Sequence, residues 1–228
     1  AEGNKVFLLT NKKLEEKPWP WESIDTTFYL DNVDNTFETY KQILDGMAHL
    51  MRSEKIDLVV ALDDFDVEKA ALVREHFRIP GMGQTTARYF RDKLAMRIQA
   101  RDNGIPVPEF TSLFNDLAIT HFLETTNAPW VVKPRSEASA AGIKKVYNLD
   151  EAWQHIHSLG DERHQFLIEC FKPGDVFHID ALIKDSKVIF ERCSQYLNTP
   201  FEVAHGGGIF RSITVAHGSL DEEALTMI

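Results

Sequence analysis

The chain has 228 residues, of which 43% are hydrophobic and 26% are charged, a balance typical of a globular protein with one large or two smaller domains. Its formal net charge of −10 argues against a general nucleic-acid-binding protein, although a local basic pocket can still hold a nucleotide. No apolar run approaches the roughly 20 residues of a membrane-spanning helix, and none resembles a signal peptide, so we expect a cytoplasmic protein without a membrane partner.

The first part of the chain has the pattern of a small α/β domain. Apolar runs predict strands over 5–10, 26–31 and 56–64, and helical spacing of apolar residues predicts helices over 36–55 and 67–77. This order of elements predicts a parallel sheet within a domain of residues 1–88. Asp63 and Asp64 end the third predicted strand, where they either cap the next turn or take part in chemistry; capping is the more common role.

The later part has an α+β pattern with antiparallel hairpins. Helices are predicted over 87–104, 115–126 and 149–160, the last with Asp150 as its N-cap. Strands are predicted over 130–134, 143–148, 165–171 and 209–216, and as a pair within 175–197 that turns at 184–187. A further helix is expected to begin in 219–228. Two cysteines, Cys170 and Cys193, lie in apolar runs and are expected to be buried thiols. The sequence has no CxxC pair, so it does not indicate a zinc site.

The stretch "WVVKPRSEASAAGIKKV", residues 130–146, places one lysine at the end of an apolar strand and then a loop of small residues. Such a loop lets the backbone come close to a ligand, and its hydroxyls and amides hold phosphate oxygens while Lys133 supplies positive charge. The alternative is a surface hairpin with an exposed lysine. Neither a GxxxxGK[ST] loop nor a GxGxxG loop is present.

Two further stretches accompany this one: "RDKLAMRIQARDNGIPVPEF" before it and "FLIECFKPGDVFHIDAL" after it. In this order and spacing, the three resemble the ATP-grasp superfamily, particularly its biotin-carboxylase-like and amino-acid-ligase-like members. The resemblance covers residues 93–215. It implies an N-terminal parallel-sheet pre-ATP-grasp domain over 1–88, a small lid subdomain over 89–168 and the first part of a large subdomain over 169–228.

The resemblance also implies roles for individual residues. Lys93 and Lys133 would contact the nucleotide phosphates, and the loop that contains Ser136, Ser139, Ala140 and Gly142 would close on the triphosphate. Glu169 would meet the adenine or ribose edge, and the backbone of Cys170 and Phe171 would contact adenine. For the ribose, Asp175, Val176 and His178 stay open. The plainer alternatives are that Lys93 and Glu169 face solvent and that His178 and Asp180 form a structural pair.

The segment "EVAHGGGIF", residues 202–210, resembles the oxyanion loop of esterases, but the GxSxG turn that such enzymes need is absent. Its three glycines are better explained as letting a loop approach the substrate or the triphosphate. In that position Arg211 would face the oxygens of an acyl phosphate as a catalytic residue.

The implied activity is an ATP-dependent carboxylate–amine ligase that forms an acyl phosphate, with ATP and Mg²⁺ as cofactors. Its partners would be a small-molecule carboxylate and an amine; the oligomeric state stays open, with a homodimer as one candidate. The alternatives are a bicarbonate-activating carboxylase or carbamoyl-phosphate-type subunit, and a non-catalytic nucleotide-binding domain. The acidic residues that hold magnesium in the superfamily are expected beyond Ile228, so we name no metal ligand and expect the ATP-grasp domain to be incomplete at its C-terminus and this chain to be inactive.

Overall fold

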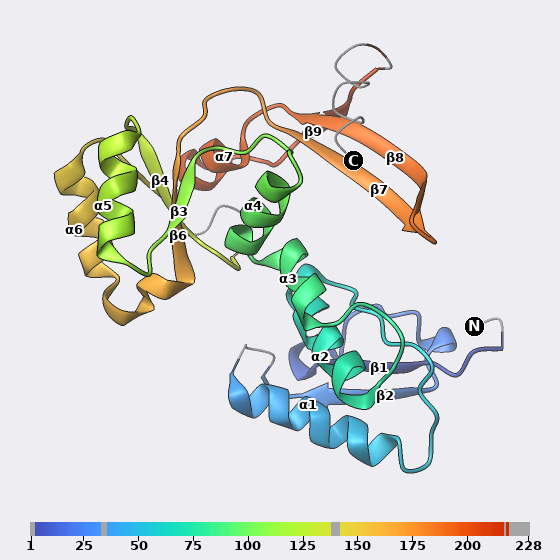
Figure 1. The fold of residues 1–228 in the computed structure, drawn as a ribbon. Coiled ribbons are helices and arrows are strands. Elements are labelled where there is room, and N and C mark those ends of the chain that lie inside the picture. Colours follow the sequence, from blue (N-terminus) through green and yellow to red (C-terminus); the bar gives the residue numbers. More distant parts are fainter. Residues whose placement is uncertain (1–2, 33–35, 138–141, 217, 219–228) are drawn as a thin grey trace. The chain divides into compact units, whose positions relative to one another are not determined.

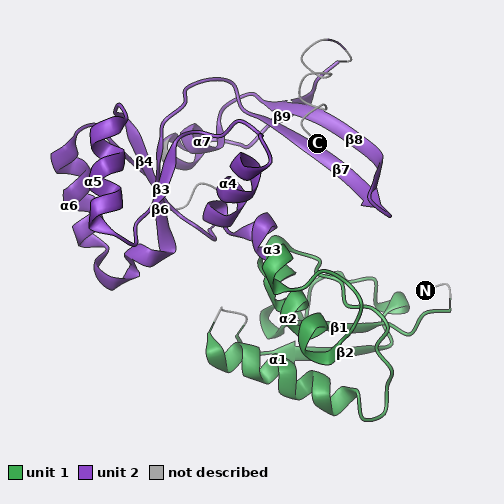
Figure 2. Ribbon diagram, in the orientation of Figure 1, with its two compact units in different colours: residues 1–87 green, residues 88–228 purple. Residues whose placement is uncertain are grey.

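The computed structural model describes residues 3–32, 36–137, 142–216 and 218. The chain divides into two compact units, residues 1–87 and 88–228, which Figure 2 colours separately. In the part that the structure describes, no helix is both long enough and apolar enough to cross a membrane.

The first unit contains the predicted parallel sheet. Strand β1 (Phe7–Asn11) pairs in parallel with β2 (Thr26–Leu30), and helices α1 (Phe37–Leu50) and α2 (Val67–Phe77) follow. Short 3-10 turns cover Lys12–Leu14, Trp21–Ser23 and Asp64–Asp66. A small core forms because α1 and α2 each present apolar residues at helical spacing, with Ile43, Val73 and Ile79 buried at its centre.

The predicted strand over 56–64 is wrong. The backbone there joins no ladder, and Leu58, Val60 and Leu62 are exposed by 69%, 62% and 73%. The apolar pattern of this segment therefore does not reflect a strand. Its Val59 carbonyl accepts a hydrogen bond from the side chain of Arg74, through Nε at 2.9 Å, and not from the backbone of a neighbouring strand. The capping role of Asp63 is confirmed, because its side chain accepts from the Phe65 N–H at 2.8 Å.

The predicted helix over 87–104 is two helices, α3 (Gln84–Arg91) and α4 (Lys93–Asp102). The break falls at Asp92, whose backbone has extended angles, φ −88° and ψ 108°. Its carboxylate accepts from the N–H groups of Leu94 at 3.0 Å and Ala95 at 3.4 Å, so Asp92 begins a new helix as its N-cap. The spacing of apolar residues does not reveal this break, because it has the same helical period on both sides of Asp92.

A four-stranded antiparallel sheet forms the centre of the second unit, in the order β3-β6-β4-β5. Its strands are β3 (Phe110–Ser112), β6 (Phe166–Cys170), β4 (Trp130–Pro134) and β5 (Lys144–Val146). Helices α5 (Asp116–Thr125) and α6 (Leu149–Ser158) lie beside this sheet in Figure 1. Asn148 caps α6, not Asp150 as predicted, because the asparagine side chain accepts from the Glu151 N–H at 2.9 Å.

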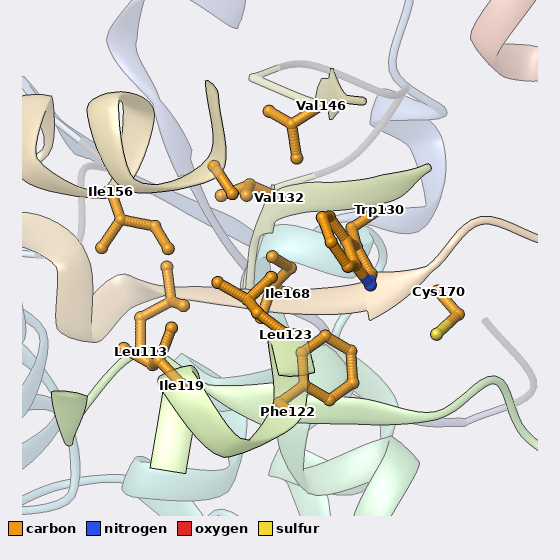
Figure 3. Close-up of a cluster of buried hydrophobic side chains, with 11 residues drawn as sticks. Leu113, Ile119, Phe122, Leu123, Trp130, Val132, Val146, Ile156, Ile168 and Cys170 are labelled. Atoms are coloured by element: carbon orange, nitrogen blue, oxygen red, sulfur yellow. The ribbon is translucent and has the colours of Figure 1, made fainter. Parts of the chain in front are cut away.

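The core of this unit lies between the sheet and the two helices, as Figure 3 shows. From the strands come Trp130, Val132, Ile168 and Cys170, and from α5 come Ile119, Phe122 and Leu123. Side chains alternate between the two faces of a strand. The odd-numbered β4 residues and Glu169 of β6 therefore point to the opposite face, away from this core.

A second sheet follows, made of β7 (Phe177–Lys184), β8 (Lys187–Tyr196) and β9 (Ser212–Thr214) in that order. The predicted turn is confirmed: Asp185 and Ser186 both have left-handed φ, 51° and 60°, as a tight hairpin requires. Helix α7 (Pro200–Gly206), with a capping box from Thr199 and Glu202, was not predicted. The helix expected in 219–228 lies outside the described residues.

We predict that Ile168→Ala will destabilise the second unit by about 3 kcal/mol, because Ile168 is fully buried and its truncation leaves a cavity in the core. Ile183→Ala, at a strand position that is 60% exposed, is the matched control and should change the stability by less than about 1 kcal/mol. Urea unfolding followed by far-UV circular dichroism measures both. Equal losses for the two variants would contradict the core described here.

Candidate functional site

The candidate site lies on the face of the β3-β6-β4-β5 sheet that points away from α5 and α6. In the antiparallel register, Val131 of β4 stands opposite Glu169, and Lys133 stands opposite Leu167. Lys133 and Glu169 are therefore diagonal neighbours on the same face, within reach of each other's long side chains. Both residues are 8% exposed, so the predicted solvent-facing alternative for Glu169 is wrong.

The Glu169 carboxylate is shared by two cations. Its Oε1 accepts a hydrogen bond from Lys133 Nζ, and its Oε2 accepts one from Arg97 Nε at 3.0 Å. Arg97 comes from the second turn of α4, so this carboxylate ties the helix to the sheet. Charge-assisted hydrogen bonds of this kind are stronger than those between neutral groups.

Lys133 keeps binding capacity after this contact. An ammonium group has three N–H donors, and among the described residues only Glu169 accepts from it. Burial lowers the pKa of Lys133, the Glu169 charge opposes that effect, and Arg97 adds to the lowering. A buried ammonium with spare donors is suited to an anionic ligand that lends it further acceptors.

Lys93 is the first residue of α4, and it holds the segment that follows β4. Its N–H donates to the Arg135 carbonyl at 2.8 Å, and its Nζ contacts the carbonyls of Glu137 and, at 3.5 Å, Arg135. Arg91 Nη2 donates to the Ser136 carbonyl at 2.6 Å. Burial lowers the pKa of Lys93, the charges of Lys133 and Arg91 lower it further, and the charge of Glu137 opposes this effect.

Asp92 and Arg135 form a two-pronged ion pair behind these lysines. Arg135 Nε donates to Asp92 Oδ1 at 2.9 Å and Nη2 donates to Oδ2. Burial works to raise the pKa of Asp92, but the hydrogen bond and charge of Arg135, with the amides of Leu94 and Ala95, outweigh it and lower the pKa below its ordinary value of 3.8. The pair fixes the end of β4 against the start of α4.

The charges of this region do not cancel. Among the described residues that these contacts join, there are five cationic side chains and three acidic ones: Arg91, Lys93, Arg97, Lys133 and Arg135 against Asp92, Glu137 and Glu169. The whole chain carries a net charge of −10, so this local positive excess runs against the protein's overall charge. Such an excess attracts anions.

The small-residue loop is described only at its two ends. Ser136 and Gly142 lie within the described residues, whereas Ser139 and Ala140 lie outside them. Gly142 has a φ of +69°, and a Cβ at this position would lie 2.8 Å from Pro134 Cγ. Glycine is therefore required where the chain returns past the end of β4.

In the segment after Glu169, some backbone N–H groups are used within the described part of the protein and one is not. The N–H of Cys170 donates to the Glu109 carbonyl at 2.9 Å, and that of Phe171 donates to Pro129 at 3.0 Å. The next amide, of Lys172, donates to no group among the described residues. The Phe171 ring lies under Lys145, with Nζ 3.5 Å from the ring centroid. Cys170 and Cys193 are free and buried, as predicted.

The other predicted residues lie on the β7-β8-β9 sheet and its connections. His178 Nδ1 is 3.3 Å from Asp180 Oδ2, within ion-pair distance, while Asp175 is exposed. The Val176 carbonyl accepts from the Tyr196 N–H at 2.8 Å. Arg211 is exposed just before β9, and within the described part of the chain its side chain makes no hydrogen bond or ion pair with the residues around Lys133. No group of three potential metal ligands occurs among the described residues.

Arg97, Asp92 and Arg135 were missed by the sequence analysis. Arg97 stands four residues after Lys93 on one helix, a spacing that places both side chains on the same face. That spacing could have indicated Arg97 once Lys93 was suspected. Nothing local indicates that Glu169, 72 residues away, is its partner.

Comparison with known proteins places the fold. No family model matches the chain. The L-arginine-specific L-amino acid ligase of Bacillus subtilis is 27% identical over 158 residues, which cover 66% of this chain and 38% of that protein. The solved L-amino acid ligase from Bacillus licheniformis has a TM-score of 0.66 at 24% identity, over 87% of this chain and 46% of that one. The N5-carboxyaminoimidazole ribonucleotide synthetase of Thermus thermophilus has a TM-score of 0.68 at 20% identity, over 99% and 56%.

The chain has an ATP-grasp fold. Its relatives and structural neighbours are ATP-grasp enzymes, so the predicted resemblance is confirmed. One further ATP-grasp neighbour is a biotin carboxylase domain from Hydrogenobacter thermophilus in complex with MgADP and bicarbonate; its TM-score is 0.59 at 16% identity, over 90% of this chain and 51% of that one. The chain thus spans about half of these ATP-grasp structures or less.

We predict that Asp92→Asn will destabilise the protein by about 1.5–3 kcal/mol at neutral pH, because Arg135 loses a charged partner and α4 loses a charged cap. The folded-state pKa of Asp92 is lowered, so its contribution is fully present above the unfolded pKa near 3.8 and is lost as the pH falls through the folded value. Urea unfolding of both proteins between pH 3 and 7, with Asp102→Asn as an exposed control, tests this. A stability gap that widens below pH 4 would contradict it.

Proposed function

We propose that this chain carries the nucleotide-binding residues of an ATP-dependent carboxylate–amine ligase that works through an acyl phosphate. The observation that carries the proposal is the positive excess around Lys133 in an otherwise acidic protein. The similarity to amino acid ligases supports the reaction class. Because the chain spans 38% of the first of these relatives, the substrates are part of the proposal.

The triphosphate would bind between Lys93 and Lys133. Lys133 has spare N–H donors, and Lys93 Nζ holds main-chain carbonyl oxygens at Glu137 and Arg135, which are acceptors that a phosphate oxygen can replace. We assign the loop from Ser136 to Gly142, which includes Ser139 and Ala140, to the phosphates. The loop would keep water from the reactive intermediate.

Adenine would lie along the segment 169–172. Cys170 and Phe171 use their own amides within the protein, so the Lys172 N–H is the donor that this segment has to spare for a ring nitrogen. Among the described residues, no backbone N–H outside the strands donates to the carbonyls of Phe171 and Lys172, which would accept from the amino group of adenine. For the ribose, the candidates remain Asp175, Val176 and His178, of which Asp175 has the exposed carboxylate.

The proposed reaction has two steps. A carboxylate oxygen of the first substrate attacks the γ-phosphorus, the bond from that phosphorus to the β,γ-bridging oxygen breaks, and ADP leaves. The amine then attacks the acyl carbon, its proton is lost and phosphate departs. The protein contributes position and positive charge, from Lys93 and Lys133 and, at the acyl phosphate, from Arg211.

Magnesium would accompany the nucleotide, as in the neighbour that holds MgADP. The described residues bring together no set of three carboxylate, histidine or cysteine ligands. We therefore assign no metal ligand, and no step of the proposal depends on one.

A second candidate is a bicarbonate-activating enzyme, favoured by the biotin carboxylase neighbour that holds MgADP and bicarbonate. The two are separated by measuring ADP release with bicarbonate alone and with a carboxylate–amine pair. Release that bicarbonate stimulates without an amine would favour the second candidate.

We predict that Mg–ATP at about 100 times its Kd will stabilise the protein by roughly 2.7 kcal/mol and raise the Tm by about 2–4 °C. Lys133→Ala should abolish the shift, because it removes the buried ammonium from the phosphate site. Lys187→Ala, on the exposed β7–β8 turn, is the control and should keep the shift. Differential scanning fluorimetry measures all three. A full shift in Lys133→Ala would contradict the proposed site.

A further inference from the structure

The proposed phosphate contacts use Lys93 and Lys133 and give no role to Arg97, which shares the Glu169 carboxylate with Lys133. The Arg97 side chain is 23% exposed, and its Nε donates to Glu169 Oε2 at 3.0 Å. The other oxygen of the same carboxylate takes Lys133. Arg97 and Lys133 therefore share one carboxylate partner.

The charge of this trio decides what Lys133 can offer. With Arg97 present, two cations share one carboxylate, and the trio keeps one positive charge. Without Arg97, Lys133 and Glu169 would form a neutral buried pair. The spare donors of Lys133 would then meet phosphate in a pair without net charge, and the buried carboxylate beside them would repel the incoming anion, which weakens binding.

We propose that Arg97 is a positioning residue of the nucleotide site: it holds the Glu169 carboxylate so that Lys133 keeps its charge for phosphate. The inference rests on the proposed function, since it concerns the same site. When phosphate binds, the spare donors of Lys133 turn to it, and Glu169 stays paired through Arg97.

A purely structural role would be different. Arg97 also ties α4 to β6, and its loss could weaken ATP binding by loosening that tie. In that case, removing Glu169 as well would not restore binding, because the tie would still be missing. If charge is what matters, Glu169→Gln in the Arg97 variant restores the net charge of the trio and should restore binding.

The test is isothermal titration of the chain with Mg–ATP. The variants are Arg97→Gln, Arg97→Lys, Glu169→Gln and the double variant Arg97→Gln/Glu169→Gln. Arg101→Gln, one turn further along α4 with a 58% exposed side chain, is the matched control. Lys133→Ala tests the nucleotide site itself, and far-UV circular dichroism checks that each variant is folded.

We expect Arg97→Gln to weaken ATP binding by about tenfold, a change of about 1.4 kcal/mol, and Arg97→Lys and Arg101→Gln to stay within about threefold of the wild type. The double variant should bind about tenfold more tightly than Arg97→Gln, because it regains the net positive charge of the trio, and Glu169→Gln alone, which keeps both cations, should bind at least as tightly as the wild type. If Arg97→Gln does not fold, the double variant, which has no unpaired carboxylate, and Arg97→Lys still test the proposal.

Two results would overturn the role of Arg97 alone: wild-type affinity in Arg97→Gln, or a double variant that binds as weakly as Arg97→Gln, while Lys133→Ala abolishes binding. If the wild type does not bind ATP, or if Lys133→Ala binds as well as the wild type, the proposed nucleotide site fails and the role of Arg97 fails with it.

Discussion

The carboxylate of Glu169 is buried between the side chains of Lys133 and Arg97, and the candidate site depends on this arrangement. A buried carboxylate with one cation has no net charge, whereas a carboxylate with two cations leaves one positive charge on this face of the sheet. The strand register makes the arrangement possible, because it sets Lys133 and Glu169 diagonally on one face while Val132 and Ile168 fill the core on the other.

The break between α3 and α4 serves the same end. Asp92 begins α4 and binds Arg135 through both oxygens, so the first turn of the helix is fixed against the end of β4. Lys93 and Arg97 then project from one face of α4, four residues apart. In this way the Asp92 cap helps to bring the cations of α4 close to Lys133 of β4, although the helix and the strand are far apart in the sequence.

Periodic features could be predicted from the sequence, and features that depend on distant partners could not. The spacing of apolar residues correctly indicated α1, α2 and α5, and the strand β4 that contains Lys133. The same alternation predicted a strand over 56–64, where the backbone finds no neighbouring strand. The pairing of Arg97 with Glu169, across 72 residues, is set by strand register and helix placement, which no local pattern contains.

We propose that the positive excess around Lys133 recognises phosphate. The most direct measurement is the affinity of the chain for adenosine, AMP, ADP and ATP by isothermal titration at low and physiological salt. We expect the affinity to rise with each added phosphate and ATP binding to weaken as salt screens the charges. Adenosine binding as tightly as ATP, with no effect of salt, would contradict it.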